Sequence, residues 1–520
     1  MATTIQRPIN TLSPKRVQSG RASRLPAARP RAAYPGVVHI TAECWPFART
    51  GGLGEAVSTL ASVQAARGAA VSVILPLYRG VRETTPALTP IGAPFDVPLG
   101  PRMERARILR APTTGHGVRV FFVEHNGFFD RAGLYGERGA DYADNELRFA
   151  FFCRAALESI PLLAPDAAIL HAHDWHAAPA LIRLAGGLHR DSGLAAPLAT
   201  VLTVHNAAFQ GNFPRDAMDV LGLPATLFNW RTLEQYGRVN LLKGAIALAN
   251  AIVTVSPTHA AELTTVEGGF GLHDTFAAVR DRLSGILNGI DPGLWNPATD
   301  PLIDARYSAA DVSGKRRCKV ALQRAFRLPV RPDVPVIAMC ARLTEQKGVD
   351  LVLGAVPAFP QAQVIIVGEG DARYGEAVTA LAHHHPERVA VDLTFRDATE
   401  HLLLAGADMV VIPSRYEPCG LTQMRAQRYG AIPIARRVGG LADSVCDGVT
   451  GFLFDEYSTP ALVGALTRGL EAYAHPTVWE RYTRAAMAQD FAWDRSVERY
   501  RDVYRDALAR QRAASGATPR

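Results

Sequence analysis

Three charged side chains follow two apolar runs in the second half of this chain. Arg342 and Lys347 come after the apolar run 334–341, and Glu417 comes after the apolar run 407–413. Because the carboxyl ends of parallel strands meet at one edge of a sheet, we expect these side chains to lie close together. Two cations match a diphosphate, and a carboxylate can face the hydroxyl groups of a sugar. The pattern therefore predicts a pocket for a sugar joined to a diphosphate.

A turn and a helix follow the second of these runs. The chain passes Gly420 and enters an amphipathic stretch, residues 421–429, that predicts a helix. A helix that opens directly after a strand presents free backbone N–H groups and the positive end of its dipole to an anion. We therefore expect Gly420, Leu421 and Thr422 to bind phosphate.

The positive charge of the chain is confined to its first 35 residues. The chain has 520 residues and a formal net charge of +7. Residues 1–35 hold seven basic side chains and no acidic one, so the remaining residues are neutral overall. We expect residues 1–35 to be a disordered basic tail, either a plastid transit peptide or, as we favour, an extension of a cytoplasmic bacterial protein. A neutral body without a long apolar run predicts neither a nucleic-acid nor a membrane partner.

The six cysteines are scattered along the sequence without a CxxC pair. This spacing indicates neither a zinc site nor a disulfide framework. A reduced, cytoplasmic protein is the simplest interpretation.

Apolar, strand-like runs alternate with helical patterns, which predicts an α/β fold with largely parallel sheets. The first block of predicted strands is Val37–Thr41, Val71–Leu75, Val118–Val123, Ala168–His171, Ala199–Val204 and Ile252–Val255, and the second is Val336–Ala341, Gln363–Val367, Val389–Leu393, Met409–Ile412 and Ile432–Ala435. Between the blocks, residues 286–301 are rich in Gly, Asn and Pro and predict a hinge-like linker. We expect two facing, doubly wound Rossmann-like domains (36–285 and 302–478) across a cleft, and a charged helical segment (479–510) that packs back on the first domain.

A short glycine-rich pattern occurs twice. Residues 49–57 read RTGGLGEAV and residues 437–445 read RVGGLADSV, each after a predicted strand and before a predicted helix. We expect both domains to present a glycine-rich loop and a helix N-terminus to one cleft, with Gly51 and Gly52 binding the donor in the first domain. The alternative is a pair of unrelated strand-to-helix turns.

The motifs of the chain, taken in order, resemble those of one enzyme family. They are TAECWPFARTGGLGE near the start, YADNELRF (142–149), HAHDWH (171–176), TVHNAAFQG (203–211), NLLKGAI (240–246), VSPTHAAE (255–262), LNGIDPGLWNPATD (287–300), ARLTEQKGVDL (341–351), PSRYEPCGLTQ (413–423) and GGLADSV (439–445). This series resembles the bacterial glycogen synthases and plant starch synthases of glycosyltransferase family 5. The resemblance implies the GT-B arrangement of two Rossmann-like domains, ADP-glucose as co-substrate and an α-1,4-glucan as acceptor. It also implies transfer to the 4-OH with retention, without a cofactor or a metal.

The resemblance assigns roles to residues that match the family motifs. It places Glu417 beside the donor glucose, and Lys347 and Arg342 on the leaving diphosphate. Preorganised cations there act where negative charge develops in the transition state. Arg49, in the first glycine-rich loop, is implied to reach the donor phosphates after the domains close.

The same resemblance marks residues of the first domain. It favours His173 as a contact of the donor glucose, and we expect the rings of His171 and His173 to point to opposite faces of their strand. Asp144 matches an acid near the active site, although an N-cap of the following helix is an alternative. The secondary candidates are His171, Asp174, His205, Asn206, Lys243 and Glu55.

Two positions depart from the family pattern. The family's first loop usually has Lys where this chain has Arg49, and Asp where it has Glu55. Guanidinium and ammonium groups present their donors differently, so the exchange is not automatically conservative. Two alternatives follow: a transferase for another sugar nucleotide or acceptor, and a catalytically silent homologue that binds glucan or nucleotide.

Overall fold

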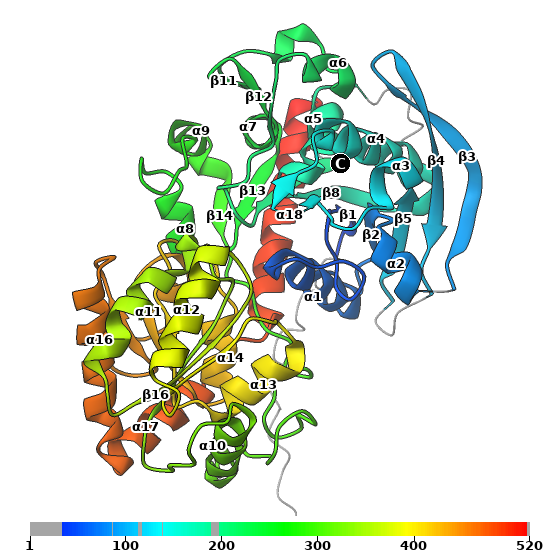
Figure 1. Cartoon of the computed structure of the whole chain (residues 1–520). Helices are drawn as coiled ribbons and strands as arrows, with labels where there is room; N and C mark the ends of the chain where they lie inside the picture. The colour runs from blue at the N-terminus through cyan, green and yellow to red at the C-terminus, as the bar shows by residue number, and fades with distance from the viewer. Residues whose placement is uncertain (1–33, 86, 113–116, 138, 189–196, 517–520) are drawn as a thin grey trace, which may run out of the picture. The chain divides into compact units, whose positions relative to one another are not determined.

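Two sheets of mainly parallel strands organise the chain (Figure 1). The computed structural model describes residues 34–85, 87–112, 117–137, 139–188 and 197–516, so the predicted tail lies almost entirely outside the described residues. Helices connect successive parallel strands in both halves, as in Rossmann-like domains. The predicted fold class, two α/β domains with parallel sheets, is confirmed.

The first sheet has nine strands, and seven of them run parallel. Its spatial order is β14 (Leu283–Gly285), β13 (Ala251–Thr254), β9 (Ala199–Val204), β8 (Ala167–His173), β1 (Gly36–Ile40), β2 (Val71–Pro76), β5 (Arg119–Glu124), β4 (Arg102–Arg110) and β3 (Thr89–Leu99). The helices of this half are α1 (Gly52–Ala66), α2 (Arg79–Thr84), α3 (Asn126–Phe129), α4 (Asn145–Leu163), α5 (Asp174–Ala185), α6 (Ala217–Leu221), α7 (Leu241–Leu248), α8 (Pro257–Glu262) and α9 (His273–Ala278). Short strands form two small extra sheets, β6 (Gly136–Glu137) with β7 (Ala140–Asp141), and β10 (Asn212–Phe213), β12 (Arg238–Asn240) and β11 (Glu234–Gln235).

The second sheet has six strands, all parallel. Its spatial order is β17 (Val389–Asp392), β16 (Gln363–Val367), β15 (Val336–Cys340), β18 (Met409–Ile412), β19 (Ile432–Arg436) and β20 (Phe452–Phe454). The helices of this half are α10 (Ser313–Ala325), α11 (Val349–Ala355), α12 (Ala372–His384), α13 (Asp397–Gly406), α14 (Thr422–Arg428), α15 (Gly439–Ser444), α16 (Thr459–Tyr473) and α17 (Pro476–Met487), and α18 (Asp494–Ala514) follows them. Among the described helices, none combines the length and apolar character needed to cross a membrane.

Successive residues of the central strands enter different hydrophobic cores, because side chains alternate between the two faces of a sheet. On β15, Ala338 and Cys340 pack with residues of α10 and α13. Ile337 and Met339 pack with residues of α11 and α16. Both faces are covered, which explains why these strands read as continuous apolar runs in the sequence.

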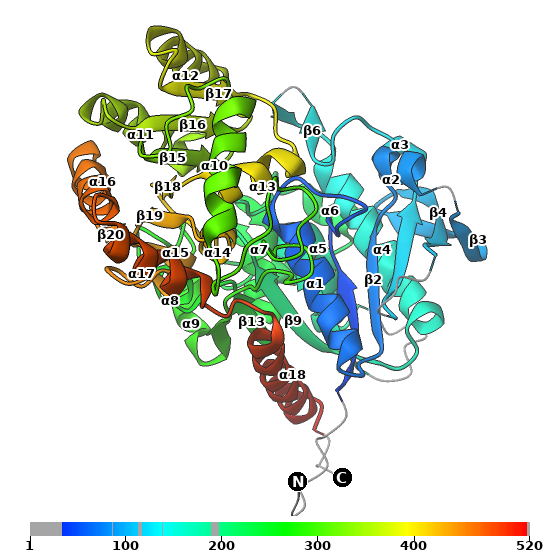
Figure 2. The ribbon, with the colours of Figure 1, turned by 90° about the horizontal axis from the view of Figure 1, so that it is seen from below.

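Helix α18 returns to the first sheet after the second domain is complete. It packs on β8, β9 and β13 and lies beside α1 (Figure 1 and Figure 2). Its residues Val497 and Tyr500 share a core with Val37, Ile169 and Val201, which lie on one face of the first sheet. The opposite face belongs to a separate core formed with α4, α5 and α7.

The segment 286–301 contains no helix or strand. Ile290 N–H donates to the Phe491 carbonyl oxygen at 2.9 Å, and Ser496 Oγ donates to the Leu287 carbonyl oxygen at 2.5 Å. The two segments that connect the halves of the molecule are therefore hydrogen-bonded to each other.

Every strand predicted from the sequence is present, but the hairpin of β3 and β4 was not predicted. β3 reads TPIGAPFDVPL, in which apolar residues stand at every second position from Ile91 to Leu99 but three prolines interrupt the run. Proline removes a backbone donor and is tolerated mainly on edge strands. β3 is the edge strand of its sheet, so its composition fits its place although it hides the strand from pattern reading.

Candidate active site

An acid and a cation form an ion pair at the edge of the second sheet. Lys347 Nζ lies 2.6 Å from Glu417 Oε2. Lys347 ends the short helix η3 (Glu345–Lys347) after β15, and Glu417 lies in the turn between β18 and α14. Because β15 and β18 are neighbouring parallel strands, both turns reach one edge. Glu417 is almost fully buried, and Ser414 Oγ donates to the same carboxylate oxygen at 2.9 Å.

The second glycine-rich loop supports the turn that carries Glu417. Gly439 has φ +43°, and a Cβ there would lie 2.0 Å from the Glu417 carbonyl oxygen, so glycine is required. Gly440 N–H donates to that carbonyl oxygen at 3.0 Å, and Gly439 N–H donates to the Glu262 carboxylate at 2.9 Å. Both N–H groups are used within the protein. These two N–H groups are therefore not available to a ligand in this structure.

Arg342 is exposed at the same sheet edge and, among the described residues, makes no ion pair. It lies near Tyr416, where burial raises the pKa of the hydroxyl and the positive charge of Arg342 opposes that rise. A pocket of about 620 Å³ begins at the next residue, Leu343, and lies between the turns after β15 and β16 and helix α12. Leu343, the Gly368–Gly370 turn and Thr379 line this pocket. Because Arg342 has no ion-pair partner among the described residues and is exposed, its guanidinium is available to a ligand.

Arg49 has a protein partner in this structure. Its Nη2 lies 2.7 Å from Asp397 Oδ1, at the start of α13, and both side chains are partly exposed. The loop that carries Arg49 is held by the buried Glu43, which accepts hydrogen bonds at 2.7 Å from both N and Oγ1 of Thr50. The Tyr135 hydroxyl donates to the same carboxylate at 2.6 Å. The fixed loop therefore directs Arg49 toward a residue of the second half of the chain.

The two loops predicted to bind phosphate approach each other. α1 begins at Gly52, α14 begins at Thr422, and a Cβ on Gly52 would lie 3.9 Å from Leu421 Cδ1. Around Gly51, nothing lies within 4 Å of the place of a Cβ. Gly420, with φ +69°, forms the tight turn before α14. The structure thus brings Gly51 and Gly52 together with the Gly420–Thr422 turn.

Glu55 lies inside a buried ion-pair cluster. Its Oε2 is 2.5 Å from Arg425 Nη2, and Arg425 Nη1 is 2.9 Å from Glu400 Oε1. The guanidinium also lies over the ring of Trp295, 4.1 Å from its centroid. We call Arg425, Glu55, Glu400 and Trp295 the Arg425 cluster. It joins α1, α13, α14 and the 286–301 linker, so Glu55 serves a contact between elements rather than facing a ligand.

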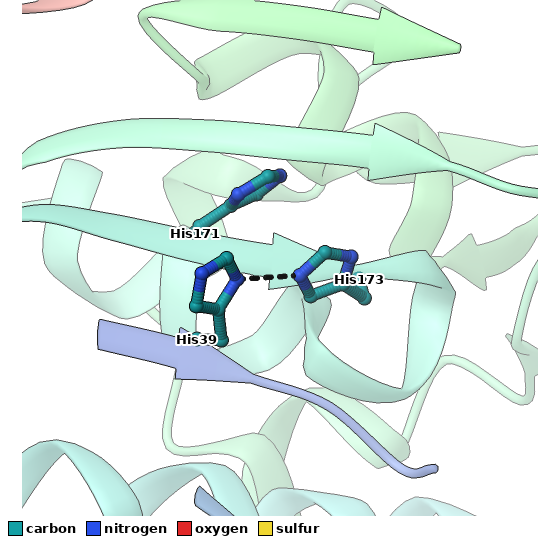
Figure 3. Close-up of side chains that lie close together, drawn as sticks. All are labelled: His39, His171 and His173. Carbon is teal, nitrogen blue, oxygen red and sulfur yellow. Dashed lines mark hydrogen bonds between the residues drawn. The ribbon is translucent and has the colours of Figure 1, made fainter. Parts of the chain in front are cut away.

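His39, His171 and His173 lie close together in the first sheet (Figure 3), and they contact Gln64 of α1 and Tyr504 of α18. His39 on β1 is the register partner of His171 on β8, and the rings of His171 and His173 lie 4.3 Å apart. The expectation that His171 and His173 point to opposite faces is wrong, because residues two apart on a strand share a face. His39 Nδ1 lies 3.0 Å from His173 Nε2, and His173 Nδ1 lies 3.1 Å from His205 Nε2.

His39, His171 and His173 bring one nitrogen each within 4.8 Å of one another, close enough to suggest a metal site. The ring nitrogens of these three residues already have protein partners. His171 bonds to Tyr504 and Thr203 at 2.8 and 2.7 Å. His39 bonds to Gln64 and His173, and His173 bonds to His39 and His205. A metal would have to break several of these hydrogen bonds, so the arrangement favours a hydrogen-bond network.

The ends of β8 and β9 meet beside this network. Asp174 has φ +55° and accepts a hydrogen bond from His205 N at 2.7 Å. Burial raises the pKa of Asp174 to about 7, although its bonds to the His205 and Asn206 backbones oppose that rise. The Asn206 side chain bonds to Tyr416, a residue beside Arg342. His205 and Asn206 therefore stand close to the Arg342 edge of the second sheet.

Two candidates are engaged elsewhere. Asp144 forms a two-pronged ion pair with Arg131, with both contacts at 2.7 Å. Burial alone would raise the pKa of Asp144, but the hydrogen bonds and charge of Arg131 lower it overall. Asp144 precedes α4 without a side-chain cap, so the capping alternative is wrong. Lys243 Nζ donates to the Glu234 carbonyl oxygen at 2.6 Å.

Sequence reasoning missed several residues of this site. Glu43 follows β1 inside a quoted motif, and an acid directly after a strand was a usable signal. The Gly368–Gly370 turn between β16 and α12 was another, since a glycine-rich strand-to-helix turn suits phosphate or nucleotide. His39 and Arg425 gave no local signal, because their partners lie far away in the sequence.

Comparison with known proteins agrees with this architecture. The family model described as the starch synthase catalytic domain matches residues 36–278, and that of the glycosyl transferases group 1 matches residues 323–486. A glycogen synthase of Anaeromyxobacter dehalogenans (strain 2CP-1) is 42% identical, over 90% of this chain and 98% of that protein. A glycogen synthase of Geotalea daltonii is 38% identical, over 91% of this chain and 99% of that protein.

Solved structures give the same assignment. The catalytic domain of starch synthase IV from Arabidopsis thaliana, bound to ADP and acarbose, superposes with a TM-score of 0.84 at 33% identity, over 92% of this chain and all of that one. A sucrose-phosphate synthase from Thermosynechococcus elongatus has a TM-score of 0.57 at 18% identity, over 91% of this chain and 99% of that one, and supports the fold alone.

Two parallel-sheet domains with cations and a carboxylate at the sheet edge define a glycosyltransferase of the GT-B fold. Within that class, the chain belongs to the family of glycogen and starch synthases.

Proposed function

We propose that this protein is a retaining glucosyltransferase that transfers glucose from ADP-glucose to the 4-OH end of an α-1,4-glucan. The observation that carries the proposal is the Lys347–Glu417 pair beside Arg342 at one sheet edge. Departure of the nucleoside diphosphate leaves negative charge on its terminal phosphate and positive charge on the sugar ring. Fixed cations stabilise the first and a fixed carboxylate the second, and both are in place before the reaction.

We propose one orientation for the donor. We place the nucleoside in the pocket beside Leu343 and the Gly368–Gly370 turn, and the diphosphate against Arg342 and Lys347. The glucose then lies against Glu417. Gly51, Gly52 and the Gly420–Thr422 turn, which approach each other, would bind the phosphates from the opposite side.

His205, rather than His173, is the histidine we assign to the donor glucose. Both ring nitrogens of His173 are bonded to other histidines. His205 uses Nε2 for His173, and among the described residues the structure gives its Nδ1 no partner. Asn206 and Tyr416 lie beside it, and Asp174 fixes its backbone. A free ring nitrogen next to the Arg342 edge suits a sugar hydroxyl.

We also propose the domain division 36–285 and 302–478, with a hinge at 286–301 and helix α18 belonging to the first domain. The hydrogen bonds between the two connecting segments and the packing of α18 support it. Closure of this hinge would bring the Arg49 loop onto the donor. We propose a cytoplasmic location and neither cofactor nor metal, on the grounds of the bacterial glycogen synthase relatives and the occupied histidine nitrogens.

The function is tested by measuring incorporation of labelled glucose into glycogen from ADP-glucose and UDP-glucose in parallel. We expect incorporation from ADP-glucose at a much higher kcat/KM, with α-linked product. Preference for UDP-glucose would favour the other-nucleotide alternative. No incorporation from either donor, with measurable ADP binding, would favour the silent homologue.

Arg49 offers a sharper test, because in this structure it forms an ion pair with Asp397 instead of contacting a donor. If Arg49 leaves Asp397 to bind the donor phosphates on closure, Arg49→Ala should lower kcat about tenfold and leave donor KM nearly unchanged. Arg49→Lys should keep most of the activity, because the positive charge is retained. Steady-state kinetics with ADP-glucose measure both.

The control for this test is Asp397→Ala. Removing Asp397 frees Arg49, so activity should stay the same or rise. If Arg49 matters only through its ion pair, Arg49→Ala and Asp397→Ala will lower kcat equally, and the donor role is excluded.

A further inference from the structure

A line of hydrogen bonds runs from the last helix to the proposed donor-site histidine. Gln64 Nε2 donates to Tyr504 Oη at 2.8 Å, and Gln64 Oε1 lies 2.8 Å from His39 Nε2. His39 continues to His173, as Figure 3 shows, and His173 continues to His205, at 3.0 and 3.1 Å. We call Gln64, His39, His173 and His205 the histidine relay.

The three rings of the relay are neutral near pH 7. Burial lowers the pKa of His39 to about 4 and that of His205 to about 3, and it holds the pKa of His173 well below its ordinary value. A neutral imidazole carries one N–H and one lone pair on its two nitrogens. Each ring must therefore donate on one side and accept on the other.

Because each ring donates on one side and accepts on the other, the direction of one hydrogen bond fixes the direction of every other bond in the relay. Since Gln64 donates to Tyr504 through Nε2, its Oε1 faces His39 and can only accept. His39 then donates through Nε2 and accepts at Nδ1, so His173 must donate through Nε2. His173 in turn accepts at Nδ1, so His205 must donate through Nε2. The Nδ1 of His205 is left with a lone pair.

Tyr504 decides which way the amide of Gln64 points. Its hydroxyl has one proton, and it lies 2.8 Å from both Gln64 Nε2 and His171 Nδ1. When Tyr504 donates to His171, it must accept from Gln64. The opposite arrangement would reverse every bond of the relay and place an N–H on His205 Nδ1. Tyr504, on α18, thus couples the direction of the relay to the direction of its own bond with His171.

We propose that Gln64, His39 and Tyr504 are positioning residues that hold His205 as the tautomer with a lone pair on Nδ1, ready to accept a hydrogen bond from a hydroxyl of the donor sugar. The proposal rests on the proposed function only for the identity of the sugar. The order of the hydrogen bonds stands on the geometry of the relay itself.

Two substitutions of His39 separate positioning from packing. A glutamine at position 39 can donate through its nitrogen to Gln64 and accept at its oxygen from His173, which preserves the direction of the relay. A phenylalanine keeps the flat ring but ends the relay. We expect His39→Phe to lower kcat about tenfold, the usual effect of one lost hydrogen bond to substrate, and His39→Gln to stay within about threefold of the parent. If His39 acts only by packing, His39→Phe should keep a higher kcat than His39→Gln.

A matched pair on α18 tests the far end of the relay. Tyr500 and Tyr504 lie one turn apart and are both buried, and the Tyr500 hydroxyl bonds to Thr203 rather than to a residue of the relay. Tyr504→Phe should lower kcat by about threefold to tenfold, while Tyr500→Phe should leave it nearly unchanged. Equal kinetics for the two variants would overturn the proposal.

The tautomers can also be read without activity. In the parent protein labelled with ¹⁵N-histidine, long-range ¹H–¹⁵N spectra should show His39, His173 and His205 protonated at Nε2 alone. Tyr504→Phe should give a mixture of the two tautomers. A parent spectrum with His205 protonated at Nδ1 would contradict the proposal even if the enzyme transfers glucose. Correct tautomers in a protein that transfers no glucose would contradict the proposed function instead.

Discussion

Replacement of Lys347 by alanine is expected to lower kcat by about 100-fold or more. Lys347 Nζ is fixed 2.6 Å from Glu417, at the sheet edge where Arg342 is exposed. Loss of one preorganised group that stabilises transition-state charge has an effect of this size. Lys347→Gln should behave almost identically, since the amide keeps most of the stem and loses the charge. Initial rates with saturating ADP-glucose measure the effect.

The chain contains a matched control for this experiment. Lys319 also pairs with a carboxylate in the second domain, 2.8 Å from Asp408, and is likewise sheltered from water. Asp408 precedes β18 and therefore lies at the opposite edge of the sheet from Glu417. Lys319→Gln should lower the unfolding temperature and leave kcat unchanged.

Comparison of the two lysine variants identifies the cause of any loss of kcat. If Lys347→Gln and Lys319→Gln reduce kcat in proportion to the stability they lose, the Lys347–Glu417 pair is a structural ion pair. The diphosphate role of Lys347 would then be excluded. A large, selective loss in Lys347→Gln with normal unfolding supports the assignment of the donor site.

The sheet edge was predictable because its determinants are local. Short apolar runs mark buried parallel strands, and the residues just after them must emerge at the carboxyl edge. This reasoning needs only the sequence to place Lys347 and Glu417 in adjacent turns, and the two side chains meet there. It fails for the glycines after β19, because pattern alone cannot show that Gly439 and Gly440 pack on the Glu417 backbone.

The histidine relay and the Arg425 cluster were not predictable for a different reason. Arg425 reads as an ordinary polar residue of an amphipathic helix, and its partner Glu55 lies 370 residues earlier in the chain. His39 reads as one polar position in an apolar strand. Its importance appears only when β1 and β8 are known to be neighbours in register. Long-range side-chain networks leave no periodic trace in the sequence.

The Arg425 cluster leads to the largest expected effect on stability. Burial alone would lower the pKa of Arg425, but the charges and hydrogen bonds of Glu400 and Glu55 raise it overall, so the side chain is held as a cation. All three side chains are largely sheltered from water. Removing the cation of such a group leaves carboxylates without compensation.

Arg425→Met is therefore expected to lower the free energy of unfolding by about 3–5 kcal/mol, the usual effect of removing one partner of a buried ion pair. Arg425→Lys should have a free energy of unfolding between those of the parent and Arg425→Met. It keeps the positive charge, but an ammonium group lacks the fork with which a guanidinium reaches both Glu55 and Glu400. Urea unfolding followed by tryptophan fluorescence reports the loss, and Trp295, under the guanidinium, lies within the cluster.

The triple variant Arg425→Met with Glu55→Gln and Glu400→Gln decides whether charge or packing dominates. If uncompensated carboxylates cause the loss, neutralising both should recover most of the stability, since buried ion pairs often exchange for neutral groups at little cost. Glu55→Gln alone should weaken only the link between α1 and α14, because Glu400 still pairs with Arg425. If the triple variant is as unstable as Arg425→Met, the loss comes from the stacking of the guanidinium on Trp295. Glu55 would then be a bystander rather than a partner in a contact that joins α1 to α14.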